Sequence, residues 1–201
     1  VVDVLQEEVD EDIRLLAGVG DEEISDNFYE TAKSRWPWLL VNTGTALLSS
    51  SIISLFDASI SQMVALAILM PIVASMGGNA GTQTMTVTVR ALATRDLDIY
   101  NAARVIRREA LIGLANGLLF ALLIGTAAAL WFGQRDLGFV IGAAMMVNLF
   151  TAALAGILIP LVLDKAGADP ALASSVFVTM ITDIVGFIGF LGIATWWFAL
   201  G

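Results

Sequence analysis

MGGNAGTQTMT (residues 76–86) places three glycines, two amides and three threonines inside a segment that otherwise reads as membrane-spanning. On a helix, four of these polar residues share one face: Asn79, Thr82, Gln83 and Thr86. Pro71 and the glycines predict a kink just before the stretch. The stretch alone leaves two interpretations open. Gly77 and Gly81 form a G-x-x-x-G pair for helix packing, or the polar face lines a water-filled pathway.

The composition is that of a membrane protein with several spans. Of the 201 residues, 58% are hydrophobic and 14% are charged, whereas about a quarter of the residues are charged in a soluble domain. The chain contains no cysteine and no histidine, so thiolate and imidazole metal sites are excluded and any metal ion must be held by oxygen. We expect a multi-pass protein of the plasma or inner membrane, with the lipid bilayer around it.

The acidic charge is concentrated at the start of the chain. The net charge is −9, and eleven of the nineteen acidic residues come before residue 31. Apolar residues at helical spacing predict an amphipathic cytoplasmic helix in this segment. The chain opens on Val1 and shows no cleavable apolar signal, so we expect a fragment of a longer protein. We expect no nucleic-acid partner.

Five apolar stretches reach the length of about 20 residues that a helical span needs. They cover residues 36–56, 60–89, 109–132, 137–163 and 174–198. The sequence therefore predicts an all-α membrane protein in two parts. The parts are an acidic connecting helix over residues 1–31 and a five-helix transmembrane domain over residues 32–201.

The basic residues predict the orientation of these spans. They precede span one and lie between spans two and three and between spans four and five, which leaves Arg135 alone on the other side. Because short cytoplasmic loops hold an excess of Lys and Arg, the N-terminus is predicted to be cytoplasmic and the C-terminus external.

Asp183 lies near the middle of the last span, and no Lys or Arg within the spans can pair with it. A lone carboxylate at the bilayer centre costs at least about 2.5 kcal/mol and marks a candidate functional site. Ser175, Thr179 and Gly186 recur with it at helical spacing. The structural alternative is a protonated Asp that hydrogen-bonds across a helix pair. Weaker polar signals, more typical of interhelical hydrogen bonds, are Asn116, Asn148 and Thr151.

A hard divalent cation suits this set of oxygen ligands. Mg²⁺ prefers oxygen, keeps several waters and is usually held by one or two carboxylates. One Asp183 in each chain would become two facing carboxylates across a two-fold axis, and cyclic dimers are the commonest symmetric assembly. Such a site would recognise a hydrated ion.

Four stretches of the chain resemble the MgtE family of magnesium channels. The most specific is PIVASMGGNAGTQTMTVTVRALATRDLD (71–98), and the others are RWPWLLVN (35–42), REALIGLANG (108–117) and ADPALASSVFVTMITDIVGF (168–187). The resemblance covers essentially the whole chain. It implies a magnesium channel or transporter rather than an enzyme, built as a homodimer with the ion path at the subunit interface.

The resemblance also assigns residues to the ion path. Asp183 matches the family's pore carboxylate, and the backbone oxygen of Thr179 would lie beside the hydrated Mg²⁺. The pore lining that it implies for spans two and five consists of Gly77, Gly78, Asn79, Gly81, Gln83 and Gly186.

A second Mg²⁺ is regulatory in the family and holds the channel shut from the cytoplasmic side. By position its ligands here are Glu8, Glu11, Asp12 and Asp169, with DED at residues 10–12 where the family commonly has TED. The N-terminal segment resembles the end of a CBS-domain pair that passes into a plug helix. The resemblance therefore implies that an N-terminal cytoplasmic regulatory region of the same chain is missing and that regulation is weak.

Three other functions stay open. A channel or carrier for Mn²⁺, Co²⁺ or Ca²⁺ would use the same oxygen ligands, because softness alone does not separate these ions. An intramembrane enzyme would usually need a histidine or a second central Asp, neither of which the spans contain. A scaffold protein would tolerate Asp183→Asn with little change in ion uptake.

Overall fold

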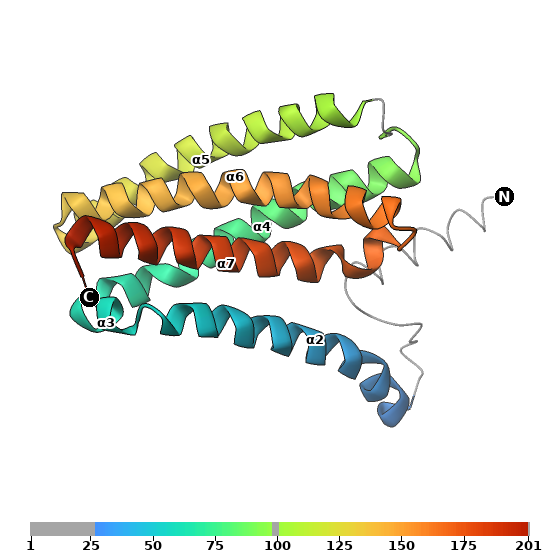
Figure 1. The fold of residues 1–201 in the computed structure, drawn as a ribbon, viewed down its shortest axis with the longest axis horizontal. Coiled ribbons are helices and arrows are strands. Elements are labelled where there is room, and N and C mark those ends of the chain that lie inside the picture. The colour runs from blue at the N-terminus through green and yellow to red at the C-terminus, as the bar shows by residue number, and fades with distance from the viewer. Residues whose placement is uncertain (1–26, 98–100, 201) are drawn as a thin grey trace.

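The structure is a computed structural model that describes residues 27–97 and 101–200, without the side chains of residues 172–174. These residues form helices joined by short turns, which confirms the predicted all-α class (Figure 1). The helices are α2 (Phe28–Ser54), α3 (Asp57–Gln62), α4 (Ala65–Ala93), α5 (Ala102–Phe132), α6 (Arg135–Lys165) and α7 (Pro170–Phe198). The predicted acidic connecting helix falls almost entirely outside the described residues.

Within residues 27–97 and 101–200, four helices are long and apolar enough to cross a membrane: α4, α5, α6 and the Ser175–Phe198 part of α7. α5, α6 and the whole of α7 contain the last three predicted spans, and α4 contains most of the second. The helices are longer than predicted, and α5 starts at Ala102 rather than near residue 109. Three arginines in its first two turns lower the hydropathy there, but Arg104, Arg107 and Arg108 fit an exposed helical end.

The predicted second span, residues 60–89, is divided in the structure. α3 ends at Gln62 and α4 begins at Ala65, so the prediction of one continuous helix from residue 60 is wrong. Neither proline nor glycine marks this break in the sequence. A tertiary contact accompanies it, because the hydroxyls of Ser59 in α3 and Thr195 in α7 lie 2.8 Å apart in a hydrogen bond.

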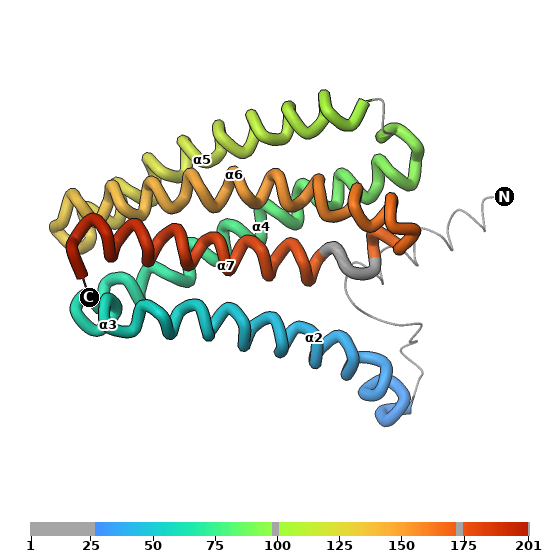
Figure 2. The backbone as a smooth tube through the Cα atoms, in the orientation of Figure 1, coloured from blue at the N-terminus to red at the C-terminus, as the bar shows by residue number. Residues whose placement is uncertain are grey.

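α2 covers the first predicted span but is not among the four apolar helices. It lies along α7 at one side of the bundle (Figure 2). Several of its hydroxyls bond within the helix: Thr43 Oγ1 donates to Leu39 O at 2.7 Å, and Ser51 Oγ donates to Leu47 O at 2.8 Å. The Ser49 hydroxyl is buried and has no hydrogen-bond partner among the described residues. The bonds of Thr43 and Ser51 make α2 compatible with lipid, and its role as a fifth span stays a prediction.

α6 is the centre of the bundle and packs against α4, α5 and α7. The core around it contains these buried side chains: Leu66, Leu69, Leu137, Met145, Leu149, Phe190 and Leu191. Glycines bring the backbones together, since a Cβ at Gly113 of α5 would lie 2.7 Å from Ala153 Cβ of α6. Small residues at helix contacts are typical of membrane bundles.

Candidate functional site

The predicted polar face forms on α4. Asn79, Gln83 and Thr86 are exposed, whereas Gly77 and Gly81 are buried on the opposite side of the helix. The packing interpretation therefore describes the glycine face, and the role of the exposed polar face in a water-filled pathway stays a prediction. The glycines pack against helices of the same chain, and the amides and hydroxyls point away from them.

Asp183 lies half-buried in α7. Among the described residues, none donates a hydrogen bond to its carboxylate and none forms an ion pair with it. Thr179, one helical turn earlier, is exposed, and its backbone oxygen accepts a hydrogen bond from Thr182 Oγ1 at 3.0 Å. A carboxylate in an apolar helix and an exposed helical turn beside it are groups that a hydrated cation can contact.

Asn148 of α6 joins the two helices that carry these groups. Its side chain is fully buried, and its Nδ2 donates to Val73 O of α4 at 2.7 Å. A Cβ placed at Gly186 of α7 would lie 2.9 Å from the same nitrogen, and one placed at Gly77 of α4 would overlap the amide. Both positions therefore need glycine, because the Asn148 amide fills the space that their side chains would take.

The Oδ1 of Asn148 is buried and has no hydrogen-bond partner within the described parts of the chain. A buried acceptor in this state costs about 1–3 kcal/mol. Asn148 is thus a junction between α4, α6 and α7 rather than a simple interhelical hydrogen bond. The sequence showed the asparagine and both glycines, but nothing in their spacing pairs Asn148 with Gly77 and Gly186.

A second close contact lies one turn further along α4. A Cβ at Gly81 would be 2.5 Å from Val178 Cγ1 of α7, and a Cβ at Gly156 of α6 would be 2.7 Å from Gly81 O. At Gly78, between these contacts in sequence, an added Cβ would meet no atom within 4 Å. The buried glycines therefore fix the spacing of α4 and α7, and Gly78 belongs to the open side of α4.

A cleft of about 250 Å³ with both polar and apolar lining residues separates α4 from α5. Gln83 lines it from α4, while Arg108, Glu109 and Asn116 line it from α5. The structure thus brings Gln83 together with Asn116, a pairing that no spacing in the sequence predicts. A cleft with this many polar groups is suited to holding water.

Asp169 is the N-cap of α7. Its side chain accepts a hydrogen bond from Ala171 N at 2.8 Å, and Pro170 follows it in the first turn. This local role is sufficient to explain an aspartate at this position. The other three predicted regulatory ligands, Glu8, Glu11 and Asp12, lie outside the described residues. Within residues 27–97 and 101–200, no group of three or more acidic side chains gathers to hold a metal ion.

Comparison with known proteins decides the family. A family model described as a divalent cation transporter, MgtE, matches residues 70–193. The match contains the glycine-rich stretch, Asn148 and Asp183. The chain belongs to the MgtE family. This confirms the resemblance expected from the sequence, and the four long apolar helices agree with a multi-pass membrane protein.

Curated MgtE relatives align along almost the whole chain. Proteins named magnesium transporter MgtE are 38% identical in Enterococcus faecalis, 36% in Bacillus subtilis and 35% in Thermus thermophilus. These alignments cover 97%, 97% and 96% of the chain but 43%, 44% and 44% of the relatives. The chain therefore spans less than half the length of the MgtE proteins that it matches.

Proposed function

We propose that the chain carries Mg²⁺ across a membrane through a pore at the interface of a homodimer. The observation that carries this proposal is Asp183, an intramembrane carboxylate without a partner among the described residues of its own chain. Membership of a divalent cation transporter family supports a transport role over an enzymatic one. The relatives' names favour Mg²⁺ as the ion.

The second chain supplies the rest of the ion site. One chain offers a single central carboxylate, and its described residues gather no cluster of three acids. A two-fold axis beside α7 brings two Asp183 carboxylates to one hydrated Mg²⁺, with the backbone oxygen of Thr179 nearby. A hydrated ion needs no closed shell of protein ligands, since its waters bond to the surrounding polar groups.

The exposed side of α4 lines the path in this proposal. Asn79 and Gly78 lie on the part of α4 that the chain's own helices leave uncovered. Gln83 is also exposed, and it lines the cleft between α4 and α5 as well. Gly77, Gly81 and Gly186 form the support behind this side of α4, because they let Asn148 and Val178 pack close to both pore helices.

We further propose that α2 is a fifth span, with the N-terminus cytoplasmic and the C-terminus external. Its exposed leucines and the hydroxyls of Thr43 and Ser51, which bond within the helix, support insertion in lipid. Lys33 and Arg35 lie at its start, and the positive-inside rule places that end in the cytoplasm. Regulation by cytoplasmic Mg²⁺ would then act through Glu8, Glu11, Asp12 and Asp169.

Transport of other divalent cations is the second candidate. The family model is described for divalent cations in general, and oxygen ligands bind Mn²⁺, Co²⁺ and Ca²⁺ as well. Uptake of Mg²⁺ into liposomes, with each of these ions added as a competitor, separates the two. Strong inhibition of Mg²⁺ uptake by equimolar Ca²⁺ would show a general divalent pathway.

The test of the pore assignment compares two aspartates. Asp183→Asn removes the central charge with almost no change of shape, whereas Asp136→Asn removes an exposed charge in the first turn of α6. We expect Mg²⁺ uptake to fall at least tenfold in the first variant and to stay near wild type in the second. Equal uptake by all three proteins would remove Asp183 from the ion path and favour a scaffold.

A further inference from the structure

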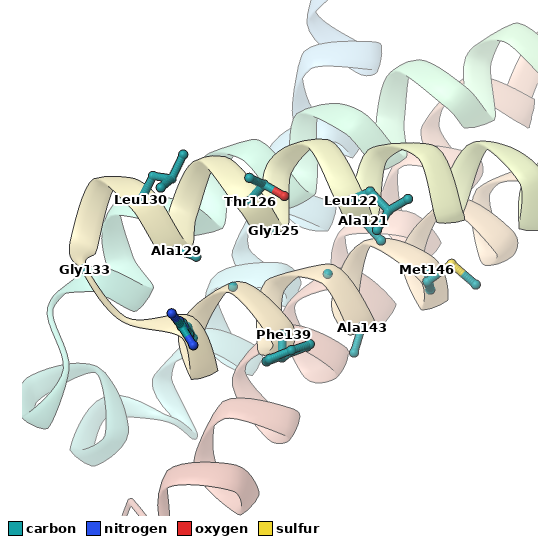
Figure 3. Close-up of a pocket in the computed structure, with 13 residues that line it drawn as sticks. Ala121, Leu122, Gly125, Thr126, Ala129, Leu130, Gly133, Phe139, Ala143 and Met146 are labelled. Carbon is teal, nitrogen blue, oxygen red and sulfur yellow. The ribbon is translucent and has the colours of Figure 1, made fainter.

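A groove of about 740 Å³ runs along the outer side of α5 and α6, away from the proposed ion path. Leu122, Thr126 and Leu130 line it from α5, and Phe139 and Ala143 line it from α6 (Figure 3). At its floor the two backbones nearly touch, since a Cβ at Gly125 would lie 2.8 Å from Gly138 O. The groove is therefore narrow and apolar over most of its length.

The groove has one charged residue, and it lies at the turn between the two helices. Arg135 lines this end, is exposed, and forms no ion pair with any residue that the structure describes. The other described basic residues lie at the opposite end of the bundle, near the start of α2, the α4–α5 connection and the end of α6 (Figure 1). Among the described residues, Arg135 is therefore the one basic side chain at this end of the helical bundle.

The length of the groove matches one leaflet of a bilayer. It extends along α6 from Arg135 to Met146, and eleven residues of helix rise about 16 Å. The hydrocarbon core of a membrane is about 30 Å thick, so a single leaflet contributes about half of that. Trp131, Trp196 and Trp197 are exposed at the same end, as is typical of residues at the lipid headgroups.

We propose that this groove binds an anionic phospholipid. One acyl chain lies between α5 and α6, and the lipid phosphate contacts the Arg135 guanidinium, which presents several N–H donors to phosphate oxygens. A lipid fits better than a second copy of the chain for two reasons. The groove has the depth of one leaflet, and its single charge lies at the headgroup level. Asp136 follows Arg135 in the sequence but does not line the groove.

Native mass spectrometry of the full chain, titrated with phosphatidylglycerol, tests this proposal without measuring ion flux. A failure of the lipid proposal can therefore be distinguished from a failure of the proposed transport function. Arg135→Gln removes the phosphate contact, and we expect phosphatidylglycerol binding to weaken about fivefold, as for one basic residue at a lipid headgroup. Lys165→Gln, at the other end of α6, is the matched control and leaves binding unchanged.

A second pair of variants tests the acyl-chain part of the groove. Ala143→Phe places a ring in the groove, whereas Ala127→Phe adds the same ring on an exposed α5 position outside it. We expect the first to abolish retention of the tightly bound lipid and the second to keep it. The proposal is wrong if Arg135→Gln binds like Lys165→Gln, or if Ala143→Phe binds like Ala127→Phe. It is also wrong if Ala143→Phe changes the oligomeric state but not lipid retention, because the groove would then be a contact between copies.

Discussion

Gly77→Ala is the sharpest test of the junction around Asn148. An alanine methyl at this position would overlap the Asn148 amide, with Oδ1 at 2.8 Å and Cγ at 2.9 Å from the new carbon. Overpacking of a closely packed site costs about 1–3 kcal/mol. Alanine is favoured over glycine within a helix by about 0.5–1 kcal/mol. The net prediction is a loss of roughly 0–2.5 kcal/mol of unfolding free energy.

Gly78→Ala is the control, because a Cβ there meets nothing within 4 Å. The overpacking cost is absent, so we expect Gly78→Ala to raise the unfolding free energy by about 0.5–1 kcal/mol. The two neighbouring substitutions in α4 should therefore have opposite signs. Reversible unfolding in mixed detergent micelles, followed by circular dichroism, measures both.

Combining Gly77→Ala with Asn148→Ala identifies the cause of the loss. Asn148→Ala alone gives up the bond to Val73 O, worth about 0.6 kcal/mol in a membrane bundle. It also leaves a cavity, which destabilises the fold, and removes the unpartnered Oδ1, which stabilises it. The net change in unfolding free energy from Asn148→Ala alone is therefore expected to be small. In that background the new methyl has room, and we expect Gly77→Ala to become neutral or stabilising. An unchanged loss, or equal effects of Gly77→Ala and Gly78→Ala in the wild-type chain, would refute the junction.

Three further changes test other parts of the fold. Asp169→Ala should destabilise α7 by about 0.5–2 kcal/mol, because the helix loses its N-cap. Asp169→Asn should stay near wild type in the same unfolding assay. An equal loss in both variants would point to a charge-dependent role of Asp169. Gly156→Ala should cost roughly 0–2.5 kcal/mol after the helix preference for alanine is subtracted, because the methyl meets Gly81 O, and a gain like the one expected for Gly78→Ala would contradict the close contact. Ser59→Ala should cost about 0.6 kcal/mol by breaking its bond to Thr195, and no change in thermal unfolding would show that this bond does not fix the α3–α4 turn.

The features that depend on local sequence patterns, such as apolar length and helical spacing, were predictable from the sequence. Long apolar stretches indicated four of the helices, because burial in lipid requires a continuous apolar segment that satisfies its own backbone hydrogen bonds. The polar face of the glycine-rich stretch was also predictable, since it depends on helical spacing alone. Asp183 was identifiable as a candidate because an unpaired charge in a span is rare.

Contacts between distant segments were not predictable. The break at residues 63–64 accompanies the contact between Ser59 and Thr195, which are far apart in the sequence. The role of Asn148 as a junction depends on α6 placing it between Gly77 and Gly186. Its three partners, Val73, Gly77 and Gly186, lie on two other helices. Local periodicity in the sequence does not indicate which helices are neighbours.

The central claim is that two chains share one ion site through Asp183, and mixed dimers test it most directly. Wild-type and Asp183→Asn chains are co-expressed in equal amounts, and the assembled protein is purified and reconstituted for Mg²⁺ uptake. Random pairing makes about one quarter of the dimers fully wild type. If both carboxylates are needed, uptake falls to about one quarter of the wild-type value. A fall to about one half would mean that each chain conducts with its own Asp183, and the shared site would be wrong.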